Sequence, residues 1–348
     1  MSYFYVPRMY HDPGTFVELR RGGKWPQAQV TYAYLWGNNT GVEFGDGYFN
    51  EWGIAIASDA CPTREDSYEK LVAEGQITDG GIGYKLRRIV AQRARNAREG
   101  ILIAGELLDH FGYVTTGRTY IIADADEAWL LAVAMGKNWI ARRVPDDEIV
   151  LLPNVHIIGV EADLTDTENV IASKGLVEYA VSRGWYDPAA GRPFSFREVY
   201  GAPPAAGSFM YEQGVDPRQW FSQELVIYQL RNWLPVEVGS VAWRLTAAPC
   251  GSVLVPWYSG ITETPGPYRK DWDIEQALSI DFHFDPPEGT FNHDPENAFD
   301  VFKALELIME DIDLARKFLT GYTGYRAMLA LNMAKELVNH FKTIHWAN

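Results

Sequence analysis

The feature that most limits the fold is a pair of helix-like segments with strand-like segments on both sides. Apolar residues recur at helical spacing over residues 82–97, and a second helix is expected over Glu99–Phe111, where Gly112 stops it. Short apolar runs before the pair predict strands, and residues 120–134 predict a hairpin with an acidic turn. This order favours helices stacked on sheets over alternating βαβ units, so the predicted fold class is α+β.

The helical pair carries two features that bear on function. Five arginines lie away from its apolar stripe and are expected to form a solvated face: Arg87, Arg88, Arg93, Arg95 and Arg98. Gly80, Gly81 and Gly83 superficially resemble a phosphate-binding loop. Because no convincing strand precedes them and no Lys-Ser/Thr pair follows, nucleotide binding is not favoured.

Composition excludes several classes of protein. The chain has 348 residues, 47% of them hydrophobic, and a formal net charge of -15, which argues against nucleic-acid partners and an anionic membrane surface. Two cysteines make no disulfide scaffold, and no run is long and apolar enough to span a membrane. The prediction is a soluble, cytoplasmic protein, for which a homo-oligomer stays open. We expect one domain over 1–290 and a helical C-terminal extension over 291–348 packed on it.

Residues 44–66 read FGDGYFNEWGIAIASDACPTRED and form the most informative stretch. After a turn at residues 45–47, the apolar run over 52–57 predicts a buried strand. Ser58 to Cys61 are expected to leave that strand, which Pro62 ends. Polar residues at a strand exit often build a functional site, and the alternative is a loop that merely starts there.

The segment GYFNEWGIAIASDAC resembles the G-x-N-E-x-G-[VI]-A-I signature of the dipeptidases related to secernins, which are N-terminal-nucleophile (Ntn) amide hydrolases. The resemblance continues in order through residues 76–112, 120–139, 150–159 and 253–262. It implies an αββα sandwich and hydrolysis of short peptides through a cysteine acyl-enzyme, without a cofactor. The alternatives are a C–N amide hydrolase of the bile-salt or penicillin-acylase kind, and a non-catalytic truncated homologue.

The resemblance also implies an N-terminal cysteine whose own α-amine acts as the base, because an α-amine titrates near neutral pH. Residues 3–8 are similar to the strand that follows this nucleophile, so the nucleophile segment is expected to be lacking from the chain as given. Residues 3–8 and 53–59 should then border an unpaired sheet edge. Cys61 and Cys250 are poor replacements, since no base lies near them in sequence and free cysteine is commonly a core residue.

Three site residues follow from matching the resemblance to this sequence. Asn154, at the end of a buried strand predicted over 150–153, is expected to donate to the oxyanion, the alternative being a turn residue. Asp59 is expected to orient an amine, the alternative being a cap. Arg244 is expected to bind a substrate carboxylate, the alternative being an edge or surface arginine. Asp281, His283 and Asp285 alternate and so share one strand face, but a solvated acidic face is commoner than a metal site, and no metal is predicted.

Overall fold

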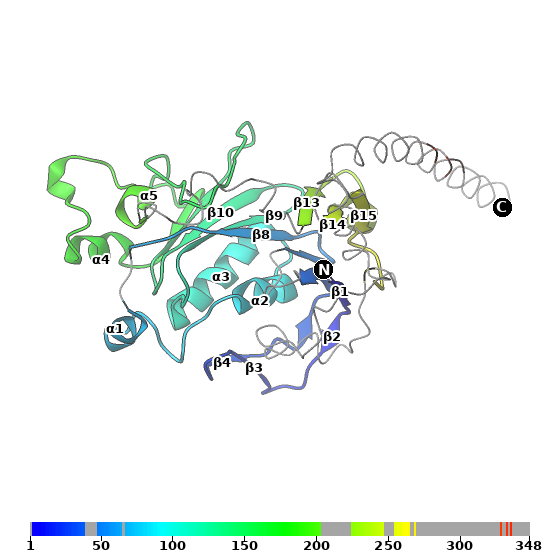
Figure 1. Cartoon of the computed structure of the whole chain (residues 1–348), viewed down its shortest axis with the longest axis horizontal. Helices are drawn as coiled ribbons and strands as arrows, with labels where there is room; N and C mark the ends of the chain where they lie inside the picture. Colours follow the sequence, from blue (N-terminus) through cyan, green and yellow to red (C-terminus); the bar gives the residue numbers. More distant parts are fainter. Residues whose placement is uncertain are drawn as a thin grey trace, which may run out of the picture.

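The structure is a computed structural model that describes residues 2–38, 47–64, 67–202, 224–246 and 254–264, with Tyr268, Met328, Asn332 and Lys335 (Figure 1). Those last three residues are helical. The rest of the expected extension over 291–348, Cys250 and the alternating run over 281–285 lie outside the described residues.

One antiparallel sheet of eight strands forms the centre of the molecule, in the order β1-β6-β7-β8-β9-β10-β11-β12. The edge strand β1 pairs with β6 among the described residues, and the Tyr5 N–H of β1 donates to Thr264 Oγ1 at 3.0 Å, so part of this edge is covered by the segment after β15. The expected edge at residues 53–59 is wrong, because β8 pairs with β9 along its whole length and with β7 at its start. The strands are β1 (Ser2–Val6), β6 (Tyr34–Asn38), β7 (Tyr48–Asn50), β8 (Ala55–Ala60), β9 (Arg118–Ala123), β10 (Ala128–Val133), β11 (Trp139–Arg143) and β12 (Val170–Ala172).

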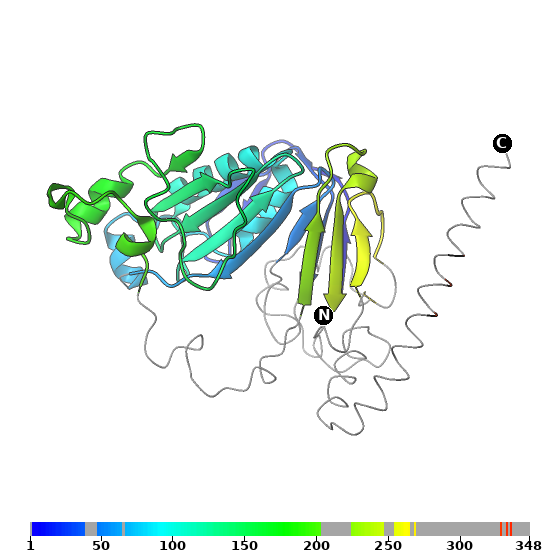
Figure 2. The ribbon, with the colours of Figure 1, turned by 90° about the horizontal axis from the view of Figure 1, so that it is seen from above.

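Two helices cover one face of this sheet. α2 (Lys85–Arg93) and α3 (Ala97–Phe111) bury their apolar stripes against side chains such as Ile56, Ile122 and Leu131 (Figures 1 and 2). α2 starts at Lys85, three residues later than the apolar spacing indicated, whereas Gly112 does end α3. α1 (Tyr68–Ala73), not a strand, precedes the glycine cluster.

The expected solvated arginine face is wrong for two of its five members. Arg87 is 1% exposed and Arg88 is 2% exposed, although both lie on α2. The Arg87 guanidinium donates to Ser58 Oγ on β8 at 2.9 Å, and Arg118 of β9 donates to the same oxygen at 2.9 Å. The Arg87 guanidinium therefore ties α2 to the sheet beneath it instead of facing water.

A second antiparallel sheet packs on the other face of the central sheet. It consists of β13 (Glu224–Gln229), β14 (Val241–Thr246) and β15 (Leu254–Tyr258), with the short helix α6 (Val236–Gly239) before β14 (Figure 2). Ala242 and Trp257 contact Leu35, Phe49 and Ala55 of the central sheet. The described residues thus form a helix layer, a central sheet and a second sheet, which confirms a mixed α and β fold.

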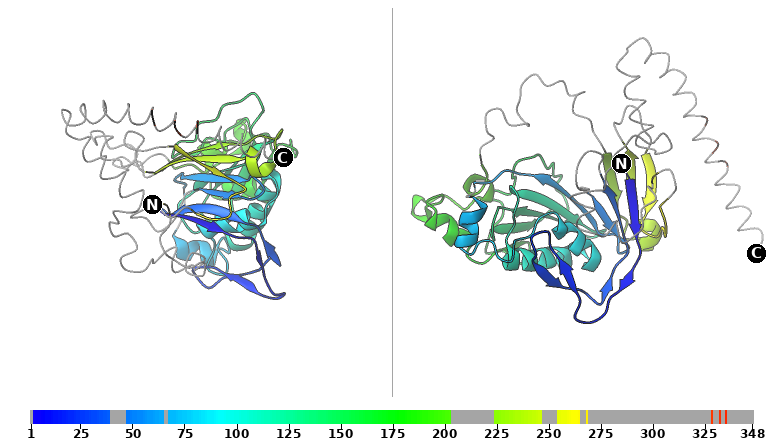
Figure 3. Two further views of the ribbon diagram at one scale, coloured as in Figure 1. Left: turned by 90° about the vertical axis from the view of Figure 1, so that its right-hand side faces the viewer. Right: turned by 60° about the horizontal axis from the view of Figure 1, so that its bottom comes forward.

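The remaining elements are short. The strand pairs β2 (Met9–Tyr10) with β5 (Val30–Thr31) and β3 (Phe16–Glu18) with β4 (Lys24–Pro26) lie beside α2 and α3 (Figure 3). A third group, α4 (Leu176–Ser182), a 3-10 turn (Pro188–Ala190) and α5 (Phe196–Val199), packs near β10 and β11. Among the described residues, no helix has the length and apolar character needed to cross a membrane.

Candidate active site

The end of β8 brings Asp59 and Asn154 together. Asp59 lies inside the strand, opposite Thr119 of β9, and does not leave it as the sequence suggested. The Asn154 side-chain amide donates to the Ala60 carbonyl at 3.1 Å. Asp59 and Asn154 are both half-buried, so each is positioned by backbone and still reaches the surface. Two candidates that are far apart in the chain therefore meet at one end of the central sheet.

Asn154 arrives there by a different route from the one expected. Residues 150–153 form no strand, and Leu151 is 84% exposed, so the buried strand expected before Asn154 is wrong. The segment crosses the end of β8 as a loop. Two contacts hold the loop on β8. They are the hydrogen bond from the Asn154 side-chain amide to the Ala60 carbonyl and a contact of 3.8 Å from Cys61 Sγ to the Pro153 carbonyl.

Cys61 is a structural residue of this corner. Its side chain is fully buried and its Sγ donates to the Asp59 carbonyl at 3.4 Å, while its backbone N–H continues the β8–β9 ladder to Gly117. Burial is the main cause that raises the pKa of the Cys61 thiol. A buried thiol with a raised pKa has little thiolate, so Cys61 is not placed to act as a nucleophile.

His156 completes the corner, and sequence reasoning missed it. Its Nδ1 lies 3.1 Å from Thr119 Oγ1, and its ring meets Phe196 edge-on at 5.1 Å between centroids. Burial lowers the pKa of His156 to about 4, against a smaller opposing contact with the Cys61 backbone. The only sequence signal was its position two residues after Asn154, which by itself predicts no role.

Strand alternation shows which layer the candidates face. Ser58 faces α2, since it accepts from Arg87, so its neighbour Asp59 faces the opposite side, where Ala55 contacts the second sheet. On β14, Arg244 lies two residues after Ala242, so both side chains are on the same face of the strand, and Ala242 packs against the central sheet. Arg244 is 1% exposed, so the surface alternative is wrong. Asp59 and Arg244 therefore both lie on the side of the central sheet away from α2, with Arg244 near Gly47 and Asp59 beside Thr119, which contacts His156.

Gly47, one residue before β7, shows how closely Arg244 approaches the central sheet. A methyl group on Gly47 would lie 3.7 Å from a guanidinium nitrogen of Arg244 and 2.7 Å from the Tyr228 hydroxyl. The guanidinium thus reaches across the space between the sheets to the side of β7 and β8.

The N-E-x-G part of the signature is structural. Asn50 donates to the Ala91 and Ala94 carbonyls at 2.9 Å and accepts from two N–H groups of the turn before β8. Glu51 pairs with Arg8 at 2.9 Å and accepts from the Ala33 N–H. Gly53 has a φ of 76°, which favours glycine. Asn50 ties the turn between β7 and β8 to α2, and Glu51 ties it to Arg8 and Ala33. The site residue Asp59 follows further along β8.

The described residues hold no group of three or more His, Cys, Asp or Glu side chains that could bind a metal ion. The alternating residues Asp281, His283 and Asp285 are outside the described part of the chain.

Comparison with known proteins identifies the family. The model of peptidase family C69 matches residues 24–225, which is more than half of the chain, and the chain belongs to this family. It is 27% identical over 201 residues to a probable dipeptidase of Salmonella dublin, covering 56% of this chain and 45% of the relative. It is 32% identical over 199 residues to a dipeptidase of Bifidobacterium longum, covering 53% of this chain and 36% of the relative. The chain thus spans less than half the length of these curated relatives.

Among solved structures, similarity is much weaker. A penicillin V acylase from Agrobacterium tumefaciens matches with a TM-score of 0.30 and 14% identity, over 41% of each chain. A mutant conjugated bile acid hydrolase from Clostridium perfringens matches with a TM-score of 0.26 and 14% identity, over 52% of this chain and 48% of the other.

Proposed function

We propose that this chain carries the oxyanion-binding and substrate-orienting side chains of a peptidase that cleaves short peptides through a cysteine acyl-enzyme. The observation that carries the proposal is the meeting of Asn154 with the end of β8 beside Asp59. Membership of peptidase family C69 supports the reaction class. The fold proposed for the full enzyme is an αββα sandwich of the Ntn type, in which the site lies between the two sheets.

Asn154 suits the oxyanion role because its amide carries two N–H donors. One donor is held by the Ala60 carbonyl, and the other can be given to the oxygen of a tetrahedral intermediate. The bond to Ala60 fixes the orientation of the amide before substrate arrives. A donor fixed in this way needs no reorganisation as negative charge develops, which is how such donors accelerate acyl transfer.

Asp59 and Arg244 suit two ends of a peptide. A carboxylate is a poor partner for an oxyanion, so Asp59 is assigned to orienting an amine, either of the substrate or of the nucleophile. The guanidinium of Arg244 matches a carboxylate with two parallel N–H donors, and its burial between the sheets strengthens that pairing. The nucleophile itself is proposed to lie outside these 348 residues, because Cys61 and Cys250 both lie inside the chain without a free α-amine, and Cys61 is also buried.

The test is hydrolysis of dipeptides with a free α-amine by two forms of the protein. One is the 348-residue chain, and the other is a longer form that starts at a processed cysteine encoded upstream. We expect turnover only in the longer form. There, Asn154→Ala should lower kcat/KM by about 10²- to 10³-fold, the usual cost of one oxyanion donor. Asn232→Ala, at an exposed asparagine, is the matched control and should leave kcat/KM unchanged.

Three outcomes would contradict the proposal. Robust hydrolysis by the 348-residue chain that is abolished by Cys61→Ala would make Cys61 the nucleophile, because nucleophile loss costs several orders of magnitude. Silence from both forms over a panel of dipeptides and N-acyl amines would favour a non-catalytic protein. Cleavage of N-acyl amines alone would assign the protein to the acylase kind of amide hydrolase.

A further inference from the structure

A cavity of about 390 Å³ lies beside the start of α2, on the helix side of the central sheet. Three cationic side chains line it: Arg20 and Arg21 from the β3–β4 turn, and Lys85 from the first position of α2. Tyr84 and Thr115 add hydroxyl groups, and Val114 adds an apolar wall. Its volume falls in the range of sites for small organic ligands.

The charge of this lining is opposite to that of the protein. The chain has 46 acidic against 31 basic residues, yet none of the described residues that line the cavity is Asp or Glu. A concave site with three cations attracts anions and repels cations. The cavity is therefore selective for a negatively charged ligand within an acidic protein.

Lys85 has no hydrogen bond or ion pair among the residues that the structure describes. Its side chain is half-buried, and desolvation of the ammonium, with a smaller contribution from Arg88, lowers its pKa to about 7. The described charged and titratable groups around Lys85 and the cavity are five arginines and three tyrosines: Arg20, Arg21, Arg87, Arg88, Arg118, Tyr68, Tyr84 and Tyr113. None of them is a carboxylate, so a bound anion would supply the countercharge that these described residues do not provide.

The walls of the cavity are held in place from several sides. Arg21 lies 4.0 Å from the centroid of the Tyr68 ring, and the Arg118 guanidinium lies 5.2 Å from that of Tyr84. Gly80 and Gly81 have φ values of 77° and 75°, and a methyl group on Gly80 would lie 2.5 Å from the Arg21 side chain. The glycine cluster thus lets the loop before α2 pack closely on Arg21, which forms one wall.

We propose that this cavity binds a small organic anion, whose carboxylate or phosphate group pairs with Lys85. The cavity is separate from the candidate active site. Arg87 and Arg118, which lie beside Tyr84 of the cavity, bond to Ser58 on the helix face of β8, whereas Asp59 faces the other side of that strand. The proposal goes beyond peptide hydrolysis and does not depend on it.

The test is isothermal titration of the protein with inorganic phosphate and, separately, with succinate, at about pH 8 in two buffers of different ionisation enthalpy. Saturable binding is expected for at least one probe, and which one binds distinguishes a phosphate from a carboxylate ligand. In the protein without ligand the pKa of Lys85 is about 7, so the amine is mostly neutral at about pH 8. A bound anion raises that pKa. Binding should therefore take up close to one proton.

Three variants make the result decisive. Lys85→Gln should lose about tenfold or more in affinity together with the proton uptake. Lys85→Arg should keep affinity but lose the uptake, because arginine stays charged. Lys174→Gln, at an exposed lysine, should change neither. Circular dichroism checks that each variant is folded. The proposal is overturned if neither probe binds, or if the Lys85→Gln protein, shown to be folded, binds as the unaltered protein does.

Discussion

His156 is held neutral by its surroundings, and this links folding to pH. Its pKa is about 4 in the folded chain, against 6.5 in the absence of burial. The unfolded chain thus takes up a proton at His156 as the pH falls through 6.5, while the folded chain does not until about pH 4. The stabilisation is complete above pH 6.5 and is lost as the pH falls towards 4, by roughly 3 kcal/mol.

The prediction is tested by urea unfolding of the unaltered protein and of His156→Gln between about pH 7 and about pH 4. The glutamine does not titrate, so the difference in unfolding free energy between the two proteins should shrink or reverse as the pH falls. All other titratable groups are present in both proteins, so their contributions to the pH dependence cancel in the difference between the two unfolding free energies. An equal pH dependence in the two proteins would show that His156 is not held neutral.

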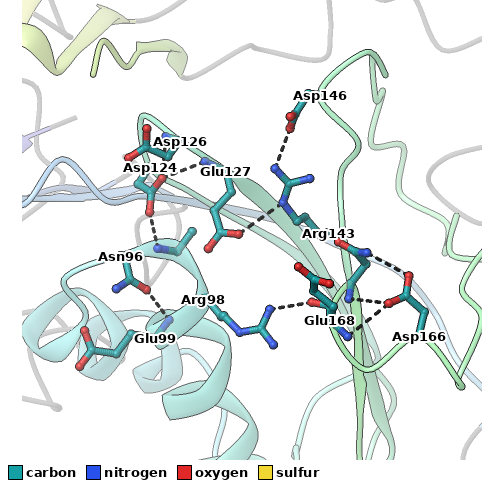
Figure 4. Close-up of polar contacts among 12 residues, drawn as sticks. Asn96, Arg98, Glu99, Asp124, Asp126, Glu127, Arg143, Asp146, Asp166 and Glu168 are labelled. Carbon is teal, nitrogen blue, oxygen red and sulfur yellow. Dashed lines mark hydrogen bonds and ion pairs between the residues drawn. The ribbon is translucent and has the colours of Figure 1, made fainter. Parts of the chain in front are cut away.

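At the scale of the elements, the start of α3 is fixed by two separate devices (Figure 4). Asn96 is the N-cap, and its side chain accepts from the Glu99 N–H at 2.8 Å. Asp124, in the β9–β10 turn, accepts from the Ala97 N–H at 2.6 Å and from two N–H groups of its own turn. One carboxylate therefore caps the helix and closes the hairpin, which fixes α3 relative to the sheet.

We predict that Asn96→Ala costs about 1 kcal/mol of unfolding free energy, the usual value for a lost N-cap. Asp124→Ala should cost more, about 2–3 kcal/mol, because hydrogen bonds to a charged acceptor are stronger and three are lost together. Asp147→Ala, at an exposed aspartate in the loop after β11, is the control, expected within about 0.5 kcal/mol of the unaltered protein. Chemical denaturation measures all three. A cost for Asp124→Ala no larger than that of Asn96→Ala would contradict the double role.

At the scale of the whole molecule, the two sheets approach each other closely at Gly53, in the turn between β7 and β8. A methyl group there would lie 2.6 Å from Ser240 Oγ and 3.0 Å from Val236 Cγ2, both beside the second sheet. Gly75 has nearly the same φ, 73° against 76°, but nothing lies within 4 Å of its added methyl group. The two glycines therefore differ in packing and not in backbone strain.

Gly75→Ala is expected to cost about 1 kcal/mol, from the left-handed backbone alone. Gly53→Ala should cost at least about 2 kcal/mol more than Gly75→Ala, because the turn must also move away from the second sheet. Thermal or chemical unfolding of both variants gives the comparison, and the difference between them isolates the contact between sheets. Equal costs would mean that the second sheet adjusts freely.

The sequence by itself determined the features that depend on local periodicity. The hairpin over β9 and β10 with its acidic turn, the end of α3 at Gly112 and the mixed α and β class all follow from spacing and turn residues. These patterns work because a strand or helix presents its side chains at a fixed period whatever it packs against. The order of strands and helices then restricted how the layers stack.

The tertiary structure decided which polar side chains are buried and which of them meet. Arg87 and Arg88 look like surface residues on a helix, yet both are buried against the central sheet, Arg87 on Ser58 of β8 and Arg88 over the Trp36 ring of β6. The pairing of Asn154 with Ala60 depends on a loop crossing the end of β8, which no local pattern encodes. Burial and convergence depend on which surfaces come into contact, and residues far apart in the chain supply those surfaces.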